Sequence, residues 1–302
     1  MTPAYANAEA HHAGNGHPQW SQSYYFNFYD PRSRAGGFMR IGLLETAGQS
    51  NMILVLFRDG RPCYYRIREA APYTSDRLDR GVEVAGLRLV SLQPSQKAKL
   101  EFADNDFTMN LAFEGLCPMA DAIAMTHNEA GALAQGFAAA HLEGPGKVSG
   151  TIRLRESEIE VNGTGFRDVS WGVRNWETLD HYCVSWPVFD NGLAFAGLTA
   201  TTVQGQRVYM KMLYDGGQWR AVQELDDVVE FSDDELTVKS LRWRYRDSLD
   251  REWEYTARPL FRVFVPFDGF LLTEHMMEYR LADGTIGYGL CECGFRLPRE
   301  PR

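Results

Sequence analysis

Hydrophobic and polar residues alternate with a period of two along most of this chain, and that alternation predicts β-strands. The clearest case is the aromatic run 20–31, which ends in an Asp-Pro pair. In an extended strand, Tyr25 and Asn27 lie on one face, and Tyr24 and Phe26 lie on the other. Asn27 is then either a core amide with backbone partners or a ligand contact, and both interpretations stay open.

The rest of the first half consists of short β-patterned segments separated by turn signals such as Asp59-Gly60. Strands are predicted at 38–44, 51–58, 63–69, 82–92, 97–103 and 107–115, and a hairpin from 147–155 and 158–161. The exception is 128–141, where apolar residues recur at helical spacing and predict a short helix. Strands at this spacing predict an antiparallel meander, a barrel or a sandwich.

The second half is almost continuously β-patterned. Strands are predicted at 181–188, 193–203, 207–214, 218–225, 236–246, 252–259, 264–280 and 285–295. The pairs Asn191-Gly192 and Asp283-Gly284 are hairpin signals. About eight strands joined by hairpins suit an up-and-down barrel that can hold one small ligand. The predicted fold class is therefore all-β, with at most short helices.

Composition narrows the class of protein. The 302 residues suffice for two domains, and we expect an N-terminal β-domain at 20–165 and a C-terminal barrel at 166–302. A net charge of −9 without a long basic block argues against a nucleic-acid partner. The apolar runs are too short to form a membrane-spanning helix.

The N-terminus and the cysteines bear on location. Residues 1–19 lack the pattern of a secretion signal, and we expect a disordered lead-in there. The 5 cysteines are sparse and odd in number, which predicts a reducing, cytoplasmic setting without a disulfide framework. Cys291 and Cys293 are expected to be core residues, because a lone Cys-x-Cys pair is only half of a zinc site.

The stretch 163–176 carries the strongest functional signal. It concentrates Arg167, Asp168, Trp171, Arg174 and Trp176, and tryptophans beside paired charges are unusual in a surface loop. We expect turn glycines here, a meeting point of the two halves, and chemistry close by. If either arginine pairs with Asp168, however, the pKa of that carboxyl falls and it becomes a structural anchor.

Other candidate residues lie on predicted strands. His141 and Glu143 share a face, and a structural pair, an acid–base pair and a metal site all stay open, although a metal needs a third ligand. Tyr209 and Lys211 also share a face. Lys211 is expected to extend to solvent at a barrel mouth rather than to act as a catalytic amine.

Three segments together resemble a known family. They are Tyr25-Phe-Asn-Phe-Tyr-Asp-Pro31, His141-Leu-Glu143 with Gly150, and the motif Gly163-x-Gly-x-Arg-Asp-x-Ser-Trp-Gly-x-Arg-x-Trp176. They are similar to bacterial proteins related to carotenoid 1,2-hydratases, within the wider AttH-like group. The resemblance implies two tandem lipocalin-like (calycin) antiparallel barrels around an apolar pocket, and water addition or cyclisation chemistry on isoprenoid, terpenoid or polyketide substrates. Many relatives have a histidine where this chain has Val169, so a mechanism that needs an imidazole after Asp168 does not transfer directly.

These observations lead to an acid-catalysed hydratase, dehydratase, isomerase or cyclase that needs no cofactor and no metal. A carboxyl group in an aromatic pocket can stay protonated, and aromatic rings can stabilise a carbocation. Asp168 is the predicted general acid, with Glu143 and Tyr182 as proton relays. The predicted substrate contacts are Tyr25, Asn27, His141, Trp171, Arg174, Trp176, Trp186, Tyr209, Lys211 and His275.

The alternative function is a carrier of a hydrophobic sterol, terpenoid or acyl molecule, and a glycosidase ranks third. Redox enzymes are disfavoured because no dinucleotide-binding glycine motif follows a strand. The expected partner is a hydrophobic small molecule, without nucleic acid or a membrane span, and a homodimer stays open.

Overall fold

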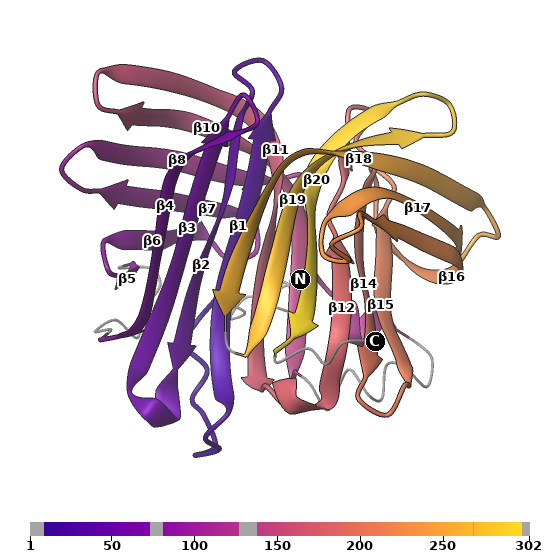
Figure 1. Cartoon of the computed structure of the whole chain (residues 1–302), viewed down its shortest axis with the longest axis horizontal. Helices are drawn as coiled ribbons and strands as arrows, with labels where there is room; N and C mark the ends of the chain where they lie inside the picture. Colours follow the sequence, from indigo (N-terminus) through magenta and orange to yellow (C-terminus); the bar gives the residue numbers. More distant parts are fainter. Residues whose placement is uncertain (1–8, 73–80, 127–137, 268, 298–302) are drawn as a thin grey trace. The chain divides into compact units, whose positions relative to one another are not determined.

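A computed structural model of the chain describes residues 9–72, 81–126, 138–267 and 269–297. The chain divides into two compact units. Unit 1 comprises Met1–Asp121 and Ala138–Arg174, and unit 2 comprises Ala122–Phe137 and Asn175–Arg302. Each unit is built on one antiparallel β-sheet, coloured indigo to magenta and rose to yellow in Figure 1. The predicted all-β fold class is confirmed, with two barrel-like sheets in tandem along the chain.

Unit 1 contains the strands β1 to β11 and a single-turn helix. Its elements are β1 (Trp20–Asp30), β2 (Ala35–Leu44), η1 (Glu45–Ala47), β3 (Gln49–Arg58), β4 (Arg61–Ala71), β5 (Val82–Val84), β6 (Leu87–Gln93), β7 (Lys97–Ala103), β8 (Phe107–Gly115), β9 (Ala120–Asp121), β10 (Ala140–Leu154) and β11 (Ser157–Val173). The sheet order is β4-β3-β2-β1-β11-β10-β8-β7-β6-β5. Most neighbouring strands in this order also follow one another in the chain and form hairpins. The pairing of β1 with β11 instead joins the beginning of the unit to its end.

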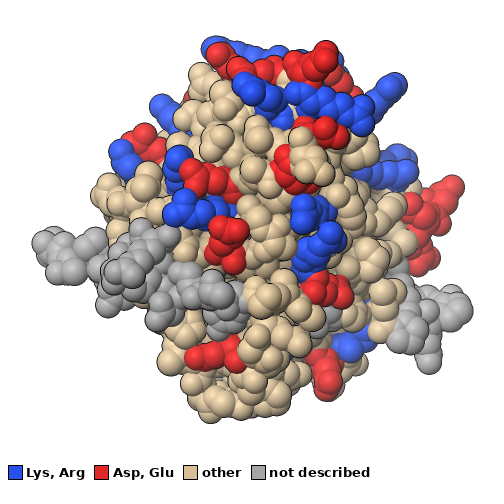
Figure 2. Space-filling view, turned by 90° about the vertical axis from the view of Figure 1, so that its left-hand side faces the viewer, with Lys and Arg blue, Asp and Glu red and all other residues tan. Residues whose placement is uncertain are grey.

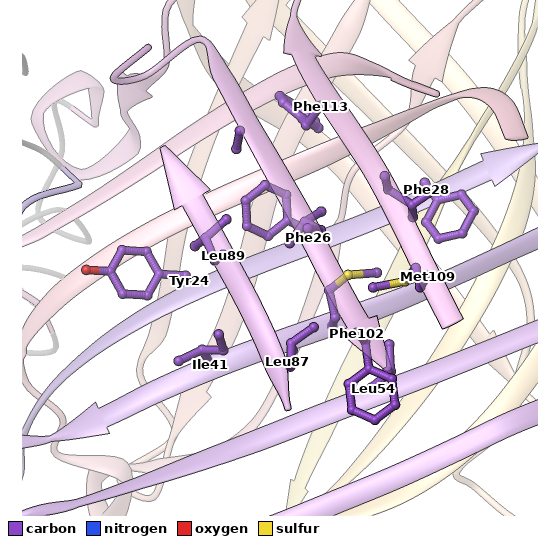
Figure 3. Close-up of a cluster of buried hydrophobic side chains, with 14 of the residues drawn as sticks. Tyr24, Phe26, Phe28, Ile41, Leu54, Leu87, Leu89, Phe102, Met109 and Phe113 are labelled. Atoms are coloured by element: carbon purple, nitrogen blue, oxygen red, sulfur yellow. The ribbon is translucent and has the colours of Figure 1, made fainter. Parts of the chain in front are cut away.

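One face of the unit 1 sheet forms a dense apolar core. Phe26, Phe28, Phe102 and Phe113 all contribute buried side chains to it (Figure 3). The alternation predicted for 20–31 is confirmed by this arrangement, since Tyr24 and Phe26 belong to the core cluster. Burial of these aromatic side chains stabilises β1 in the middle of the sheet.

Unit 2 contains the remaining elements. They are α1 (Ala122–Met125), η2 (Trp176–Thr178), β12 (Leu179–Ser185), β13 (Val188–Phe189), β14 (Ala194–Thr202), β15 (Arg207–Tyr214), β16 (Trp219–Phe231), β17 (Val238–Asp247), β18 (Glu252–Phe267), β19 (Phe270–Leu281) and β20 (Ile286–Arg296). The sheet order is β12-β14-β13-β20-β19-β18-β17-β16-β15, and β14 also pairs with β15. That extra pairing closes the sheet into a barrel. The barrel predicted from the hairpin-linked strands of the second half is thereby confirmed.

Several predicted boundaries differ from the structure. The predicted strand 82–92 is split into β5 and β6 by a turn in which Ala85 and Gly86 both have positive φ. The predicted strand 264–280 is divided between β18 and β19, with Gly269 in the turn. Most of the predicted helix at 128–141 lies outside the described residues, and its last two positions begin β10.

The central stretch 163–173 is a strand, so the prediction of turn glycines there is wrong. A Cβ atom on Gly163 would lie 2.1 Å from the backbone oxygen of Tyr29, and one on Gly165 would lie 2.0 Å from that of Asn27. These glycines allow β11 to approach β1 closely, which is a common reason for glycine inside a strand.

The cysteine prediction also needs correction. Cys183 of β12 and Cys293 of β20 form a disulfide across a directly opposed pair, with 4.1 Å between their Cα atoms. Cys291 is a buried free cysteine in the same core, as predicted. A pair 110 residues apart in the sequence could not be assigned from cysteine spacing alone.

The described residues include no helix that is long and apolar enough to cross a membrane. On the face shown in Figure 2, basic and acidic side chains lie next to one another. Basic and acidic side chains also form ion pairs, for example Lys97–Glu114 and Arg88–Glu101, each at 2.8 Å. Exposed pairs of this kind contribute only about 0–1 kcal/mol each to stability.

Candidate active site

Three polar side chains gather on β10 and β11: His141, Glu143 and Asp168. Antiparallel pairing puts Glu143 directly opposite Asp168, and Tyr25 of β1 lies opposite Asp168 on its other side. Directly opposed residues share a face of a sheet, and His141 shares that face because it precedes Glu143 by two positions. The strand register therefore builds the cluster from residues that are distant in sequence.

His141 is the centre of the cluster. Its Nε2 lies 3.2 Å from Glu143 Oε1 and also contacts Asp168 Oδ2. Burial by itself lowers the pKa of His141, but the charge of Asp168 and the hydrogen bonds to Asp168 and Glu143 outweigh it and raise the pKa to about 10. At neutral pH the imidazole is therefore protonated, and both of its nitrogens are hydrogen-bond donors.

Two atoms of the cluster are buried without a hydrogen-bond partner among the described residues. They are His141 Nδ1 and Asp168 Oδ1. Folded proteins satisfy most buried polar atoms, so a donor and an acceptor left unpaired in one cluster require an explanation. Each atom is available to a substrate hydroxyl or a water molecule, which can donate or accept a hydrogen bond.

The predicted contacts on β1 share this face of the sheet. Tyr25 is buried and its ring stacks on that of Phe38, with 6.4 Å between centroids. Asn27 Oδ1 accepts a hydrogen bond from the backbone N–H of Phe166 at 3.3 Å, whereas Asn27 Nδ2 has no partner in the described part of the chain. One end of this amide is thus a core hydrogen-bonding group and the other is free to meet a ligand.

Arg167 pairs with Glu9 rather than with Asp168. Alternation along β11 turns Arg167 to the opposite face, where it forms an ion pair with Glu9. Val169 lies on the same face as Arg167 and is fully buried in the core of unit 1. The partner of Asp168 is instead His141, an imidazole supplied by the neighbouring strand.

The predicted tryptophan contacts fall into different surroundings. Trp171 stacks on His12 at 3.8 Å between centroids and faces the core of unit 1. Trp176 lies in unit 2, where its ring contacts that of Tyr182 with 6.1 Å between centroids. Trp186 is buried and its backbone N–H donates to Leu290. Arg174 is buried as well, and its backbone N–H donates to Gln19 at 2.9 Å.

Tyr182 belongs to a separate polar group in unit 2. Its hydroxyl donates to Glu292 Oε1 at 2.5 Å, and Glu274 lies opposite Glu292 on the neighbouring strand. Burial, then the negative charge of Glu292 and a hydrogen bond to it, raise the pKa of Glu274 well above its ordinary value. Burial therefore favours the protonated form of Glu274 more than that of an ordinary carboxyl group.

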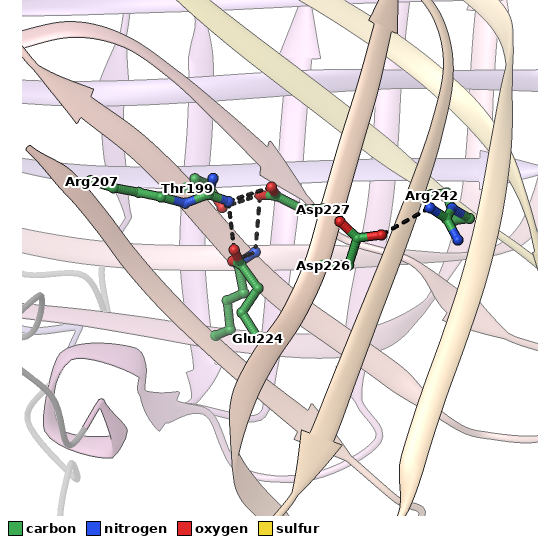
Figure 4. A network of polar contacts seen from close by, with 7 residues as sticks. Thr199, Arg207, Glu224, Asp226, Asp227 and Arg242 are labelled. Atoms are coloured by element: carbon green, nitrogen blue, oxygen red, sulfur yellow. Dashed lines mark hydrogen bonds and ion pairs between the residues drawn. The ribbon is translucent and has the colours of Figure 1, made fainter. Parts of the chain in front are cut away.

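A second polar network in unit 2 joins Arg207 to Glu224 and Asp227 (Figure 4). The ammonium of Lys211 pairs with Glu224 and lies 3.5 Å from Asp227 Oδ2. It also lies 4.2 Å from the centroid of the Trp243 ring. Because Lys211 is only 2% exposed, the prediction that it extends to solvent is wrong.

A cavity of about 410 Å³ lies beside this network. Tyr209, Lys211 and Asp247 line it together with Met125 and Val222, so its walls combine polar and apolar groups. Burial lowers the pKa of Lys211, and the charges of Glu224 and Asp227 offset that effect only in part. Tyr209 and Lys211 are therefore brought together as predicted, in a site that is separate from the His141 cluster.

His275 has a structural role. Its Nε2 accepts a hydrogen bond from the backbone N–H of Val238 at 3.0 Å, and its Nδ1 lies 3.0 Å from the backbone oxygen of Thr273. Burial lowers the pKa of His275 to about 4. Its ring is thus neutral, with both nitrogens engaged by the backbone.

The His141 cluster could also hold a metal ion. One donor atom each of His141, Glu143 and Asp168 lie within 4.8 Å of one another. The sequence offered only the first two as a pair, and Asp168 supplies the third ligand that a metal site requires. Imidazole with two carboxylates suits Zn²⁺ or a similar divalent ion.

Comparison with known proteins identifies the family. Residues 5–296 match the family described as "Domain of unknown function (DUF7064)". The chain belongs to this family. No curated protein matches it.

Solved structures share the fold. An AttH-like protein of Nitrosomonas europaea is 16% identical with a TM-score of 0.64, and 93% of each chain is covered. CghA, solved with Sch210972, is 11% identical with a TM-score of 0.65, covering 93% of this chain and 89% of the other. Kievitone hydratase of Nectria haematococca is 10% identical with a TM-score of 0.59, covering 94% and 93%. These similarities confirm the predicted tandem lipocalin-like fold, while the role assigned to the central motif stays a prediction.

Sequence reasoning overlooked two features of the candidate sites. Glu274 and Glu292 were visible on neighbouring predicted strands, but only the strand register shows that they are opposite each other. Glu9 lies in the segment that composition predicts to be disordered, yet its side chain is only 2% exposed. An isolated acidic residue in a polar terminal segment gives no signal that it has a buried arginine partner.

Proposed function

We propose that this chain is a cofactor-independent hydratase or dehydratase that acts on a hydrophobic substrate, with His141 as the proton donor. The observation that carries the proposal is a buried cluster with both an unpartnered donor, Nδ1 of the protonated His141, and an unpartnered acceptor, Oδ1 of Asp168. The addition of water to a double bond requires a proton donor and a proton acceptor. The role predicted for Asp168 therefore changes from general acid to the partner and base.

In the proposed hydration, the Nδ1–H bond of His141 breaks and its proton forms a C–H bond at one alkene carbon. The other carbon becomes cationic, and the oxygen of a water molecule forms the new C–O bond. Asp168 Oδ1 accepts the proton that this water loses, and the proton returns to His141 to complete the cycle. Glu143 keeps the imidazole protonated and oriented through its contact with Nε2.

The substrate class is inferred from the fold and from the surroundings of the cluster. One structural neighbour is named as a hydratase of kievitone, and another was solved with the organic molecule Sch210972. The aromatic ring of Tyr25 lies on the same face as Asp168 and could stabilise a cationic intermediate. We therefore propose an isoprenoid, terpenoid or polyketide-like substrate, and cyclisation of the same cation is a variant of this chemistry.

The test uses the purified full chain with kievitone and simpler prenylated phenols in isotope-labelled water. The wild type is expected to incorporate labelled oxygen, and His141→Asn to lower the rate by about 10²–10⁴-fold, the usual contribution of a positioned acid. His181→Asn is the matched control, because His181 lies on β12 and pairs with Asp180 outside the cluster. A wild-type rate in His141→Asn would exclude His141 as the donor.

Two further arms separate the alternatives. The raised pKa makes Glu274 a second candidate acid, so a loss of rate in Glu274→Gln but not in His141→Asn would move the chemistry to unit 2. Loss of activity on chelation would instead indicate that the three ligands hold a metal ion. If a substrate binds and is recovered without labelled oxygen, the carrier function is favoured.

A further inference from the structure

A buried guanidinium in unit 1 takes no part in the proposed reaction. Arg167 is fully buried, and its Cζ lies 5.2 Å from the centroid of the Phe26 ring and 5.6 Å from that of Phe113. Burial lowers the pKa of Arg167 to about 9, which still leaves it charged at neutral pH. Its Nε and Nη1 have no hydrogen-bond partner among the described residues.

The counter-charge comes from the segment that precedes the first strand. Glu9 Oε1 pairs with Arg167 Nη2, and the other oxygen, Oε2, accepts from Ser91 Oγ at 2.5 Å and from the backbone N–H of Ser95 at 3.0 Å. A carboxylate is therefore held at its two oxygens by different groups of unit 1. This arrangement shows that the pocket around Arg167 accepts a carboxylate.

The residues that follow Glu9 are attached by side-chain contacts rather than by strand pairing. Gln22 Nε2 donates to the backbone oxygen of Ala10 at 2.8 Å, and the backbone N–H of His12 donates to Gln22 Oε1 at 2.9 Å. The His12 ring stacks on Trp171 with an interplanar angle of 6°. The segment thus covers an aromatic surface next to the carboxylate pocket.

The simpler explanation is that the Glu9–Arg167 pair only anchors the N-terminal segment. That explanation accounts poorly for the use of two buried charges. A buried ion pair adds little stability compared with apolar residues of similar size, because both charges must lose their hydration. Arginine also binds carboxylates best through two parallel hydrogen bonds, and here two of its nitrogens are unused. A site that binds a carboxylate ligand would explain why a charged residue occupies this position.

We propose that Arg167 and the aromatic surface beside it form a binding site for an apolar carboxylate of the fatty-acid type, and that Glu9 occupies this site when no ligand is bound. The ligand carboxylate replaces that of Glu9 on Arg167, Ser91 and Ser95. Its apolar chain replaces residues 10–12 and lies over Trp171. This site is independent of the proposed reaction at His141, because it lies on the opposite face of β11.

The test uses decanoate as the probe, with decanol and acetate as comparisons, on the full chain and its Glu9→Gln variant. The variant removes the competing charge, so it is expected to bind decanoate about tenfold more tightly than the wild type by calorimetry. Decanoate is also expected to raise the Tm of the variant, whereas decanol and acetate leave it unchanged. Adding Arg167→Met to Glu9→Gln is expected to abolish decanoate binding.

Glu158→Gln is the matched control. Glu158 pairs with Arg153 at 2.8 Å near the exposed start of β11, away from Arg167 and from residues 9–14. It should therefore leave decanoate affinity at the wild-type level. Three results would each overturn the proposal. The first is equal affinity of the wild type and Glu9→Gln for decanoate. The others are a rise in the Tm of Glu9→Gln with decanol, or with acetate, as large as that with decanoate. If Glu9→Gln fails to fold, Glu9→Asp, which shortens the competing side chain, is measured in the same way.

Discussion

The two units each surround a basic side chain with two carboxylates, but they do so with opposite results. In unit 1, His141 contacts Glu143 and Asp168, and it leaves its own Nδ1 and Asp168 Oδ1 without partners in the described structure. In unit 2, Lys211 and Arg207 pair with Glu224 and Asp227, and Thr199 also donates to Asp227 at 2.9 Å. The first cluster has unused hydrogen-bonding capacity, whereas the charges of the second are matched.

This difference supports the proposed placement of the reaction at the His141 cluster. A fully paired network in a protein interior gains little from a further ligand, and its charges hold one another in place. A cluster with an unpaired donor and acceptor is poorly satisfied until another molecule completes it, which is common at functional sites. The count of charged residues is similar in the two clusters, so the pairing of individual atoms distinguishes them.

The largest expected effect is on activity, from matched aspartate variants. Asp168→Asn should lower the rate of oxygen incorporation by about 10²–10⁴-fold, because the amide cannot accept the proton of water or keep His141 charged. Asp227→Asn in unit 2 should leave the rate near that of the wild type. Initial rates of both variants on the same substrate make the comparison, and similar losses in both would remove the distinction between the clusters.

The next effect is on stability. Lys211→Met should lower the free energy of unfolding by about 3–5 kcal/mol, because it leaves Glu224 and Asp227 buried without their central cation. Urea unfolding measures the loss, with Lys239→Met on the exposed side of β17 as the control. A triple variant that also carries Glu224→Gln and Asp227→Asn should recover part of it. A loss in Lys211→Met no larger than in the control would contradict the structural role.

A pH dependence should distinguish the His141 cluster. The pKa of His141 rises from an ordinary value of about 6.5 when unfolded to about 10 when folded. The folded state therefore binds the extra proton more tightly, so this contribution to stability is complete below about pH 6.5 and is lost as the pH rises through about 10. Unfolding free energies measured across this range should fall with pH in the wild type and fall less in His141→Asn. Parallel curves would rule out the raised pKa.

The smallest effect is expected at the rim of the unit 2 network. The side chain of Arg207 is 50% exposed, so its ion pairs with Glu224 and Asp227 are screened by solvent. Arg207→Gln should cost only about 0.2–1 kcal/mol, and the cost should shrink at high salt. A loss as large as that of Lys211→Met would mean that Arg207, rather than Lys211, is the main cation of the network.

The candidate site could be predicted in part. The residue types His141, Glu143 and Asp168 stand out in the sequence, and the shared face of the first two follows from the strand period. The partner of Asp168 could not be predicted, because Arg167 and Arg174 are its nearest basic neighbours in the sequence. Only the pairing of β10 with β11 brings His141 to Asp168 and turns Arg167 away.

The all-β class, most strand positions and many of the hairpins were determined by the sequence alone, because alternation and turn residues act over a few neighbouring positions. The tertiary structure decided which residues meet across strands. It joined Cys183 to Cys293, set Glu274 opposite Glu292, and brought Glu9 to Arg167. Those contacts depend on strand register and chain closure, which couple residues far apart in sequence and leave no local pattern.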